Sequence, residues 1–213
     1  MTIKFIKNIE REMSNGMRDI SNKPLNEKEI EYIKEQFKSI NGDENILIFN
    51  PTDDCAKGTC YDYHKDVIYV KRNIFPDYKY GSTHPRDLMS VTAVLAHEYY
   101  GHRKYRQEYL DDYVAGQEYK TTPYWKDECR ASITAAEITP NLTYEDRKYL
   151  ILDAFKRAEE NGQVIEMDDK MIEMVYGYSK GERNITQPIS HIKYVSIDDL
   201  EQNNKERENN HGR

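Results

Sequence analysis

The chain has 213 residues and a formal net charge of −7, with 38% hydrophobic and 32% charged residues. This length accommodates one compact domain, and the acidic balance argues against a protein that binds nucleic acid through its phosphates. No apolar run approaches the roughly 18 to 20 residues that cross a bilayer, so we expect no membrane contact. The N-terminus becomes charged too early for a secretory signal. Three sparse cysteines fit a reducing compartment, and we expect a cytoplasmic protein.

The first part of the chain contains patterns for two helices and three strands. Apolar residues at helical spacing predict an amphipathic helix over 2–18. Asn26 stands three residues before Glu29, which is typical of a capping box and predicts a helix that runs to about Ile40. The segment NILIFN predicts a short buried strand. The segment GTCYDYHKDVIYVKRN predicts a hairpin that turns near His64–Asp66.

The remainder of the chain is mainly helical in pattern. Pro85 suits the first turn of a helix that runs directly into residues 95–105. Residues 107–123 are polar and predict a loop with a short helix. Three further helices and a last strand are predicted at 124–138, 144–161, 168–178 and 191–197. The tail 201–213 is charged and rich in asparagine, which predicts disorder. We expect most of the 18 tyrosines to serve in packing.

The segment LAHEYYGHRKY, residues 95–105, carries two histidines that suit a metal site. It looks like the zinc-binding signature H-E-x-x-H with one additional residue, because His97 and His102 are five positions apart. On a regular α-helix, residues five apart differ by about 140° in direction and cannot share an ion. A π-type turn absorbs one extra residue, and Gly101 tolerates such a backbone at little steric cost. The pattern therefore predicts a π-turn in which both imidazoles converge on one point.

A catalytic zinc site needs a third protein ligand and, for hydrolysis, a proton acceptor. Glu98 follows the first histidine and faces the same cavity, offset from the metal, where it suits proton transfer with water. We expect the third ligand to be a carboxylate on a neighbouring helix. Glu128 in KDECRAS, 26 residues after His102, is the leading candidate. The carboxylates that compete with it on sequence distance alone are Glu108, Asp111, Asp112, Glu118 and Glu137.

The segments HEYYGH and DECRA together resemble the H-E-x-x-G-H and E-E-C-R-A motifs of dipeptidyl peptidase III, a zinc exopeptidase. The resemblance implies that His97, His102 and Glu128 bind Zn²⁺ and that Glu98 is the catalytic carboxylate. It covers about a dozen residues, and Asp127 stands where that family has a glutamate. The chain is too short for that family's second lobe. The resemblance therefore implies hydrolysis of a peptide or protein substrate without implying dipeptide release.

The order of elements is also similar to that of small gluzincin domains, in which a strand precedes the HE helix and a glutamate helix follows it. In those domains the strand before the HE helix, here DVIYVKRN, binds the substrate backbone by edge pairing. We therefore expect an α+β fold, a small zincin-like domain of helices with a small, mostly antiparallel sheet. We expect this catalytic domain at 43–200, between an N-terminal helical segment at 1–42 and the tail.

Other functions and roles stay open at this stage. A zincin-like binding module without turnover and a helical interaction protein without metal both fit parts of the pattern. Cys55, Cys60 and His64 form a loose cluster, for which free thiols in a hairpin are favoured over a second zinc site. Cys129 is expected to be a buried structural thiol and not a ligand. The candidates for stabilising the oxyanion are Tyr176, Tyr178 and His191.

Overall fold

The computed structural model describes residues 17–18, 23–52, 58–77, 84–177 and 192–200. Helices and small sheets combine in it, which confirms the α+β class. The α-helices are α2 (Glu27–Ser39), α3 (Pro85–Leu88), α4 (Val91–Ala96), α5 (Arg106–Val114), α6 (Tyr124–Ile138), α7 (Tyr144–Glu160) and α8 (Asp169–Tyr176). The strands are β1 (Met17–Arg18), β2 (Leu47–Phe49), β3 (Cys60–Asp62), β4 (Val67–Val70), β5 (Pro76–Asp77), β6 (Gln163–Ile165) and β7 (Tyr194–Ser196). Shorter turns are η1 (Glu44–Ile46), η2 (Arg72–Ile74), η3 (His97–His102) and η4 (Arg103–Tyr105).

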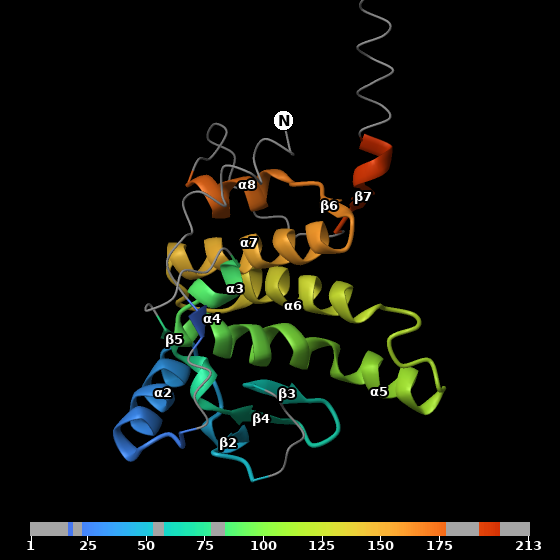
Figure 1. Cartoon of the computed structure of the whole chain (residues 1–213). Helices are drawn as coiled ribbons and strands as arrows, with labels where there is room; N and C mark the ends of the chain where they lie inside the picture. Colours follow the sequence, from blue (N-terminus) through green and yellow to red (C-terminus); the bar gives the residue numbers. More distant parts are fainter. Residues whose placement is uncertain (1–16, 19–22, 53–57, 78–83, 178–191, 201–213) are drawn as a thin grey trace, which may run out of the picture.

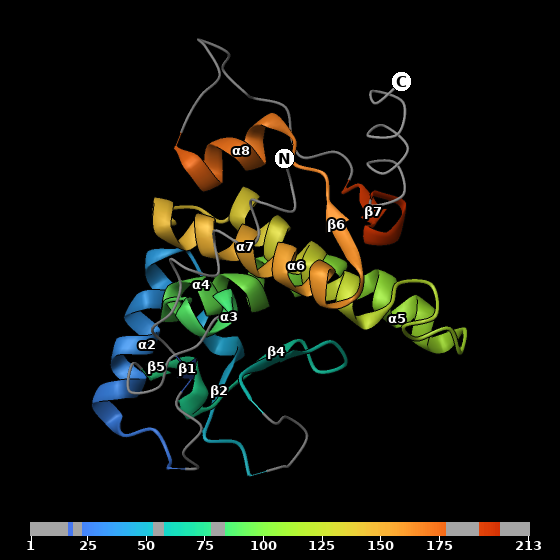
Figure 2. The same cartoon turned by 45° about the horizontal axis from the view of Figure 1, so that its top comes forward.

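The elements are stacked in layers (Figure 1). Helix α8 lies on α7, α7 lies on α6, and α6 lies on the long helix formed by α4, η3 and α5. The sheet formed by β2, β4 and β3 lies on the other side of this long helix, with α2 beside it. Figure 2 shows the same order after a turn of 45°. The HEYYGH segment therefore lies at the centre of the molecule, between α6 and β3.

The sheet beside η3 has the strand order β2-β4-β3. Strand β2 runs parallel to β4, with Leu47 opposite Ile68, and β3 runs antiparallel to β4, with Cys60 opposite Tyr69. The hairpin predicted over this segment is confirmed. The expectation that DVIYVKRN offers an edge to substrate is wrong, because β4 is the central strand and both of its edges are paired. The described strand that borders η3 is β3.

Local sequence signals account for several helix ends. The predicted capping box of α2 is confirmed, because the Asn26 side chain accepts from the Glu29 N–H (3.1 Å) and the Glu29 carboxylate accepts from the Asn26 N–H (2.8 Å). The single helix expected from Pro85 into the motif is wrong. Helix α3 ends at Leu88, and the Ser90 hydroxyl accepts from the Ala93 N–H (3.0 Å) to begin α4. The helix therefore restarts about two turns before the histidines.

The core is formed by fully buried side chains of the central helices and of α2. Leu95 from α4, Leu150 and Ile151 from α7, and Ile33 and Phe37 from α2 each have 0% exposure. Each such side chain contributes roughly 1.5–3 kcal/mol by leaving water. None of the helices in the described part of the chain combines the length and apolar character needed to cross a membrane.

The two ends of the chain are described in part. The helix predicted over 2–18 lies mostly outside the described residues, and its last two residues, Met17 and Arg18, form β1, which pairs with β5. That part of the prediction is wrong. The predicted tail at 201–213 lies outside the described residues. The strand expected near the end of the chain is confirmed as β7, which pairs with β6, a strand that the sequence analysis did not predict.

Candidate metal centre

The histidine pair lies on a π-helical turn, as the five-residue spacing predicted. Residues His97–His102 form η3, a π-helix. The Nε2 atoms of His97 and His102 lie 3.0 Å apart, and their ring planes meet at 86°. Both side chains are buried, each with 6% exposure. The widened turn thus brings two imidazoles to one point inside the molecule.

Gly101 is required for a different reason from the one expected. A Cβ at this position would lie 2.5 Å from the Ala131 carbonyl oxygen and 3.0 Å from the Ala131 Cα. Both atoms belong to the backbone of α6, which cannot move away as a flexible side chain could. The glycine therefore allows η3 to approach α6 closely enough for the two helices to share a site.

The second ring nitrogen of His97 is held by a buried chain of polar groups. Its Nδ1 lies 2.9 Å from the Ser132 hydroxyl oxygen, and that hydroxyl donates its proton to Asp153 Oδ2 (2.7 Å). Since the serine proton is directed to Asp153, the hydroxyl oxygen accepts from the His97 Nδ1–H. This leaves the lone pair of His97 on Nε2, toward His102.

His102 is held in a corresponding way from the opposite side. Its Nδ1 lies 2.7 Å from the Tyr63 hydroxyl and 3.3 Å from Asp127 Oδ2. The Tyr63 hydroxyl donates to the same carboxylate oxygen (2.8 Å). Nδ1 therefore carries the proton, and the Nε2 lone pair faces His97. Asp127 thus supports His102 through the second ring nitrogen. Such partners fix the tautomer and orientation of metal-binding histidines.

Glu128 brings a carboxylate to the same point. Its Oε2 lies 3.4 Å from His97 Nε2, and its Oε1 lies 3.6 Å from His102 Nε2. Ligands at 2.0–2.1 Å from a tetrahedral zinc are separated by about 3.3 Å from one another. The observed separations of 3.0, 3.4 and 3.6 Å bracket this value. The three residues therefore fit the ligand spacing of one zinc ion.

Glu98 lies beside this group but is held by the sheet. Its Oε2 accepts the backbone N–H of Tyr61 in β3 (2.9 Å). One of its carboxylate oxygens also lies within 4.8 Å of a nitrogen of each histidine, so Glu98 is an alternative third ligand on distance. We prefer Glu128, because its two oxygens lie 3.4 and 3.6 Å from the two Nε2 atoms, close to the separation that zinc ligands need, and because Glu98 Oε2 is already held by the Tyr61 N–H. Burial raises the pKa of Glu98, although the two histidines oppose the shift, and this suits a proton acceptor.

The charged groups of the site form a network of ion pairs and hydrogen bonds that connects α6 and α7. Burial alone would raise the pKa of Glu128, but His102, His97 and Arg157 outweigh it and hold the pKa well below its usual value. Arg157 Nη1 lies 3.0 Å from Glu128 Oε2, and its Nε donates to Asp153 Oδ2 (2.9 Å). Asp153 also accepts from Ser132, so the polar chain behind His97 leads back to Glu128.

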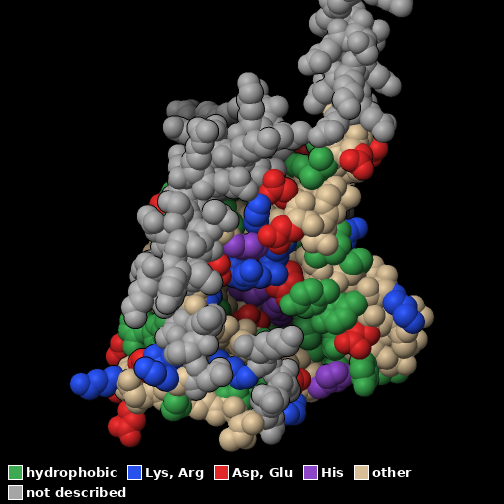
Figure 3. Space-filling model, in the orientation of Figure 1, with side chains coloured by type: hydrophobic (Ala, Val, Ile, Leu, Met, Phe, Trp, Pro, Cys, Tyr) green, Lys and Arg blue, Asp and Glu red, His purple; other side chains and the backbone are tan. Residues whose placement is uncertain are grey.

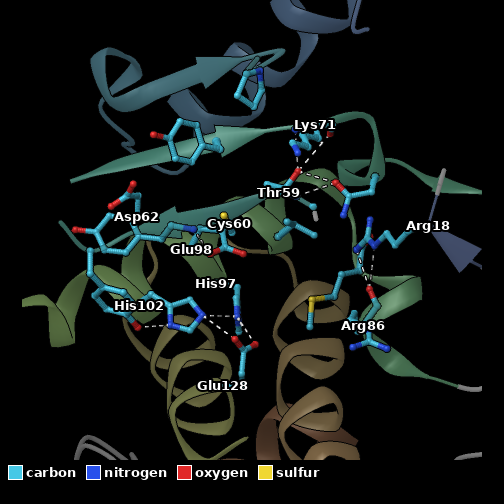
Figure 4. Close-up of a pocket in the computed structure, with 18 of the residues that line it drawn as sticks. Arg18, Thr59, Cys60, Asp62, Lys71, Arg86, His97, Glu98, His102 and Glu128 are labelled. Atoms are coloured by element: carbon cyan, nitrogen blue, oxygen red, sulfur yellow. Dashed lines mark hydrogen bonds and ion pairs between the residues drawn. The ribbon is translucent and has the colours of Figure 1, made fainter. Parts of the chain in front are cut away.

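The metal centre lies in the floor of a cleft of about 970 Å³. Figure 4 shows His97, His102 and Glu128 pointing toward one another from the helices, with Cys60 and Asp62 of β3 on the opposite side. Figure 3 shows the hollow, with histidine and acidic side chains at its base. His97, His102 and Glu128 all line this cleft, so a ligand that enters the cleft can reach the group of lone pairs.

The competing carboxylates have other partners among the described residues. Glu108 pairs with Arg130, Glu118 accepts from Tyr109, Asp111 accepts from Gln107, and Glu137 pairs with Lys170. Neither these four nor Asp112 is among the residues that line the cleft. Glu128 is therefore the carboxylate of α6 that the fold brings to the two Nε2 atoms, while Asp127 contacts His102 at Nδ1.

The remaining predicted residues lie apart from the centre or outside the described part. Cys129 is fully buried and donates to the Ala154 carbonyl (3.2 Å), which confirms a structural thiol. Cys60 forms no disulfide among the described residues, and Cys55 lies outside them. Tyr176 does not line the cleft. Tyr178 and His191 lie outside the described residues.

Several residues of the centre were missed by sequence reasoning, namely Tyr63, Ser132, Asp153 and Arg157. One signal was present: Ser132 follows Glu128 by four positions and therefore shares its helix face. Asp153 and Arg157 share a face of α7 by the same spacing, but only the packing of α7 against α6 brings them to the site.

In comparisons with protein-family models, with curated proteins and with solved structures, nothing significantly matches this chain.

Proposed function

We propose that this protein is a zinc-dependent peptidase that hydrolyses peptide bonds. His97, His102 and Glu128 are the metal ligands, and Glu98 is the proton carrier. The observation that carries the proposal is the convergence of two Nε2 lone pairs and a carboxylate, separated by 3.0 to 3.6 Å, in an open cleft. Two neutral imidazoles and one carboxylate form a ligand set typical of catalytic zinc. The motif resemblance to dipeptidyl peptidase III supports the same assignment.

A bound Zn²⁺ supplies Lewis acidity to a water molecule and to the scissile carbonyl. Glu98 accepts the proton of the attacking water at the oxygen that does not bind the Tyr61 N–H, and then delivers it to the leaving amine. The contact with Tyr61 fixes the direction of the carboxylate. Because burial raises the pKa of Glu98, its conjugate acid forms readily enough to carry the proton between the two steps.

Two hydrogen-bond donors beside the Glu128 carboxylate can stabilise the negative charge that develops on the scissile carbonyl oxygen. Arg157 holds a guanidinium 3.0 Å from Glu128 Oε2, oriented by Asp153. Tyr124 hydrogen-bonds to Glu128, and burial raises its pKa, so its hydroxyl keeps its proton. Donors that are already oriented stabilise an oxyanion without reorganisation. We assign this role to Arg157 and Tyr124, in place of the candidates from sequence.

Strand β3, which lies beside the site, offers a place for the substrate backbone to bind. Cys60, Tyr61 and Asp62 of β3 border the cleft, so an extended peptide can lie along this strand. We also propose a cytoplasmic location, because three sparse cysteines fit a reducing compartment.

Elemental analysis and a peptide-cleavage screen test the proposal. Protein purified without added metal should contain about one zinc per chain. Mass spectrometry of a peptide library should show cleavage products that disappear with a chelator and return with added zinc. Bound zinc without any cleavage would instead favour a binding module without turnover. Absence of zinc, with no uptake of added zinc, would contradict the metal site itself.

A further inference from the structure

Six aromatic rings form a continuous array at one end of the cleft, which we call the aromatic wall. It consists of Tyr63, His64, Tyr109, Tyr113, Tyr119 and Tyr124. The rings come from the β3–β4 turn, from α5, from the following loop and from the first residue of α6. Figure 3 shows hydrophobic side chains gathered at the edge of the hollow on this side.

Neighbouring rings of the wall are in contact in geometries that aromatic pairs prefer. Tyr63 stacks on Tyr109 with centroids 4.1 Å apart and planes at 17°. Tyr119 lies between Tyr109 (5.7 Å) and Tyr124 (5.6 Å). Such pairs stabilise one another beyond the area they bury. The wall is therefore a preformed surface.

The wall is continuous with the metal centre. The Tyr63 hydroxyl contacts His102 Nδ1 at 2.7 Å, and two ring-to-ring steps, of 5.8 Å and 4.1 Å, lead from the His102 imidazole through Tyr63 to Tyr109. An extended peptide advances about 3.3 Å per residue. A side chain that reaches the wall therefore belongs to a residue within about three positions of a bond held at the metal centre.

The outer part of the wall presents apolar surface that the core does not use. None of the nine residues of α5 is buried, while Tyr113, Val114 and Tyr124 are 50%, 87% and 58% exposed. The hydroxyls of Tyr63 and Tyr109 are engaged by Asp127 and Glu118. Because these hydroxyls are engaged, the wall presents the faces and edges of its rings to the cleft. Exposed apolar groups around a cleft indicate a binding surface.

We propose that the aromatic wall is a specificity subsite, which binds a large apolar side chain, above all an aromatic one, of the peptide substrate near the scissile bond. This inference rests on the proposed peptidase function. Asp127, the carboxylate that binds the Tyr63 hydroxyl at the inner end of the wall, pairs with Arg130 (2.8 Å), so this part of the wall offers no unpaired carboxylate to a cationic side chain. Tyrosines first interpreted as packing residues thereby select the substrate.

Peptide binding to the full-length, zinc-loaded Glu98→Gln protein tests the inference without turnover. The probes are blocked Ala-Gly peptides of equal length that contain one central Phe, Ala or Lys, and calorimetry gives the dissociation constants. We expect the Phe peptide to bind at least about tenfold more tightly than the Ala peptide, because it buries a ring. Equal affinities, no detectable binding of the Phe peptide, or tightest binding of the Lys peptide would overturn the inference.

Further substitutions in the Glu98→Gln protein test whether the preference for the Phe peptide arises at the aromatic wall. Tyr119→Ala should reduce the preference for Phe to below about threefold, while Tyr119→Phe should retain it. Tyr32→Ala is the matched control, because Tyr32 is a 46% exposed tyrosine on α2 outside the cleft, and it should retain the preference. If Tyr119→Ala keeps the full preference, the subsite is not the wall. If Tyr119→Ala does not fold, the comparison of the Phe and Ala peptides still decides.

The two proposals fail in different ways. If the unmodified protein cleaves peptides but Phe and Ala peptides bind equally, the subsite is wrong and the peptidase function stands. If the Phe preference is present but no peptide is cleaved, the wall is a peptide-binding surface and the peptidase function is wrong.

Discussion

The Nε2 atoms of His97 and His102 lie 3.0 Å apart, although the residues are five positions apart in the chain. The π-turn of η3 makes this approach possible. Hydrogen bonds fix both protons on Nδ1, so two lone pairs face each other across this gap. Two lone pairs at this distance repel unless a cation or a proton lies between them. The buried arrangement is therefore built for a positive charge at this point.

Replacement of Gly101 tests the close approach of η3 and α6. Gly101→Ala places a Cβ against the Ala131 backbone, and overpacking of this kind costs about 1–3 kcal/mol of unfolding free energy. We expect this loss in denaturant titrations, together with weaker zinc binding. Gly116→Ala is the control, because that position has open space and only its positive φ of 65° opposes a side chain; it should retain zinc. An unchanged Gly101→Ala protein would contradict the packing described.

Two carboxylates of α6, Glu128 and Glu137, provide a matched pair that tests the third ligand. Glu128→Ala should weaken zinc binding by more than about 100-fold, because it removes one of three ligands. Glu137→Ala should leave zinc affinity nearly unchanged, because Glu137 pairs with Lys170 (2.6 Å) away from the cleft. Competition with a chromophoric chelator measures both affinities. Loss of zinc from Glu137→Ala, with zinc retained by Glu128→Ala, would show that the third ligand is misassigned.

Two tyrosine hydroxyls in β3 and its turn provide a matched pair for the support of His102. Tyr63→Phe removes the group between His102 and Asp127, and loss of such a partner lowers metal affinity by about 10- to 100-fold. Tyr61→Phe removes a hydroxyl that binds Asp66 (2.6 Å) and should leave zinc affinity unchanged. The same chelator competition measures both variants. Equal affinities for the two variants would mean that Tyr63 does not orient the ligand.

Zinc affinity should depend on pH through His102. Burial lowers its pKa, but Glu128 and the hydrogen bond to Asp127 outweigh burial and raise the pKa to about 9. Below this value the metal-free protein holds a proton that zinc must displace. The apparent affinity should therefore rise by about tenfold per pH unit between about 7 and 8.5, and level above about 9. Calorimetry in buffers of different ionisation enthalpy should detect the proton released. Equal zinc affinity at pH 7 and pH 8 would contradict this assignment.

The features that depend on local sequence were the predictable ones. The bounds of α6 and the capping box of α2 follow from periodicity and from one Asn–Glu pair. The π-turn followed from the histidine spacing, since a regular helix would have separated the rings. Gly101 was correctly singled out, but its close neighbour, Ala131, belongs to another helix and could not be read from the motif.

The features that depend on tertiary packing were not predictable. The central position of β4 is set by its parallel pairing with β2, which is distant in sequence. Arg157 reaches Glu128 only because α7 packs on α6. The aromatic wall combines rings from segments more than fifty residues apart, so each tyrosine alone looked like a packing residue. Local patterns thus identified the proposed ligands, and the packing of the helices supplied the groups that orient them.

The most direct test of the central claim is the comparison of zinc content and peptide hydrolysis between the unmodified protein and Glu98→Gln. Glu98 is assigned to proton transfer and not to coordination, because its Oε2 is held by the Tyr61 N–H. Both proteins should contain about one zinc per chain, while hydrolysis by the variant falls by about 100-fold or more. Loss of zinc together with activity would contradict the account, because it would make Glu98 a ligand in place of Glu128.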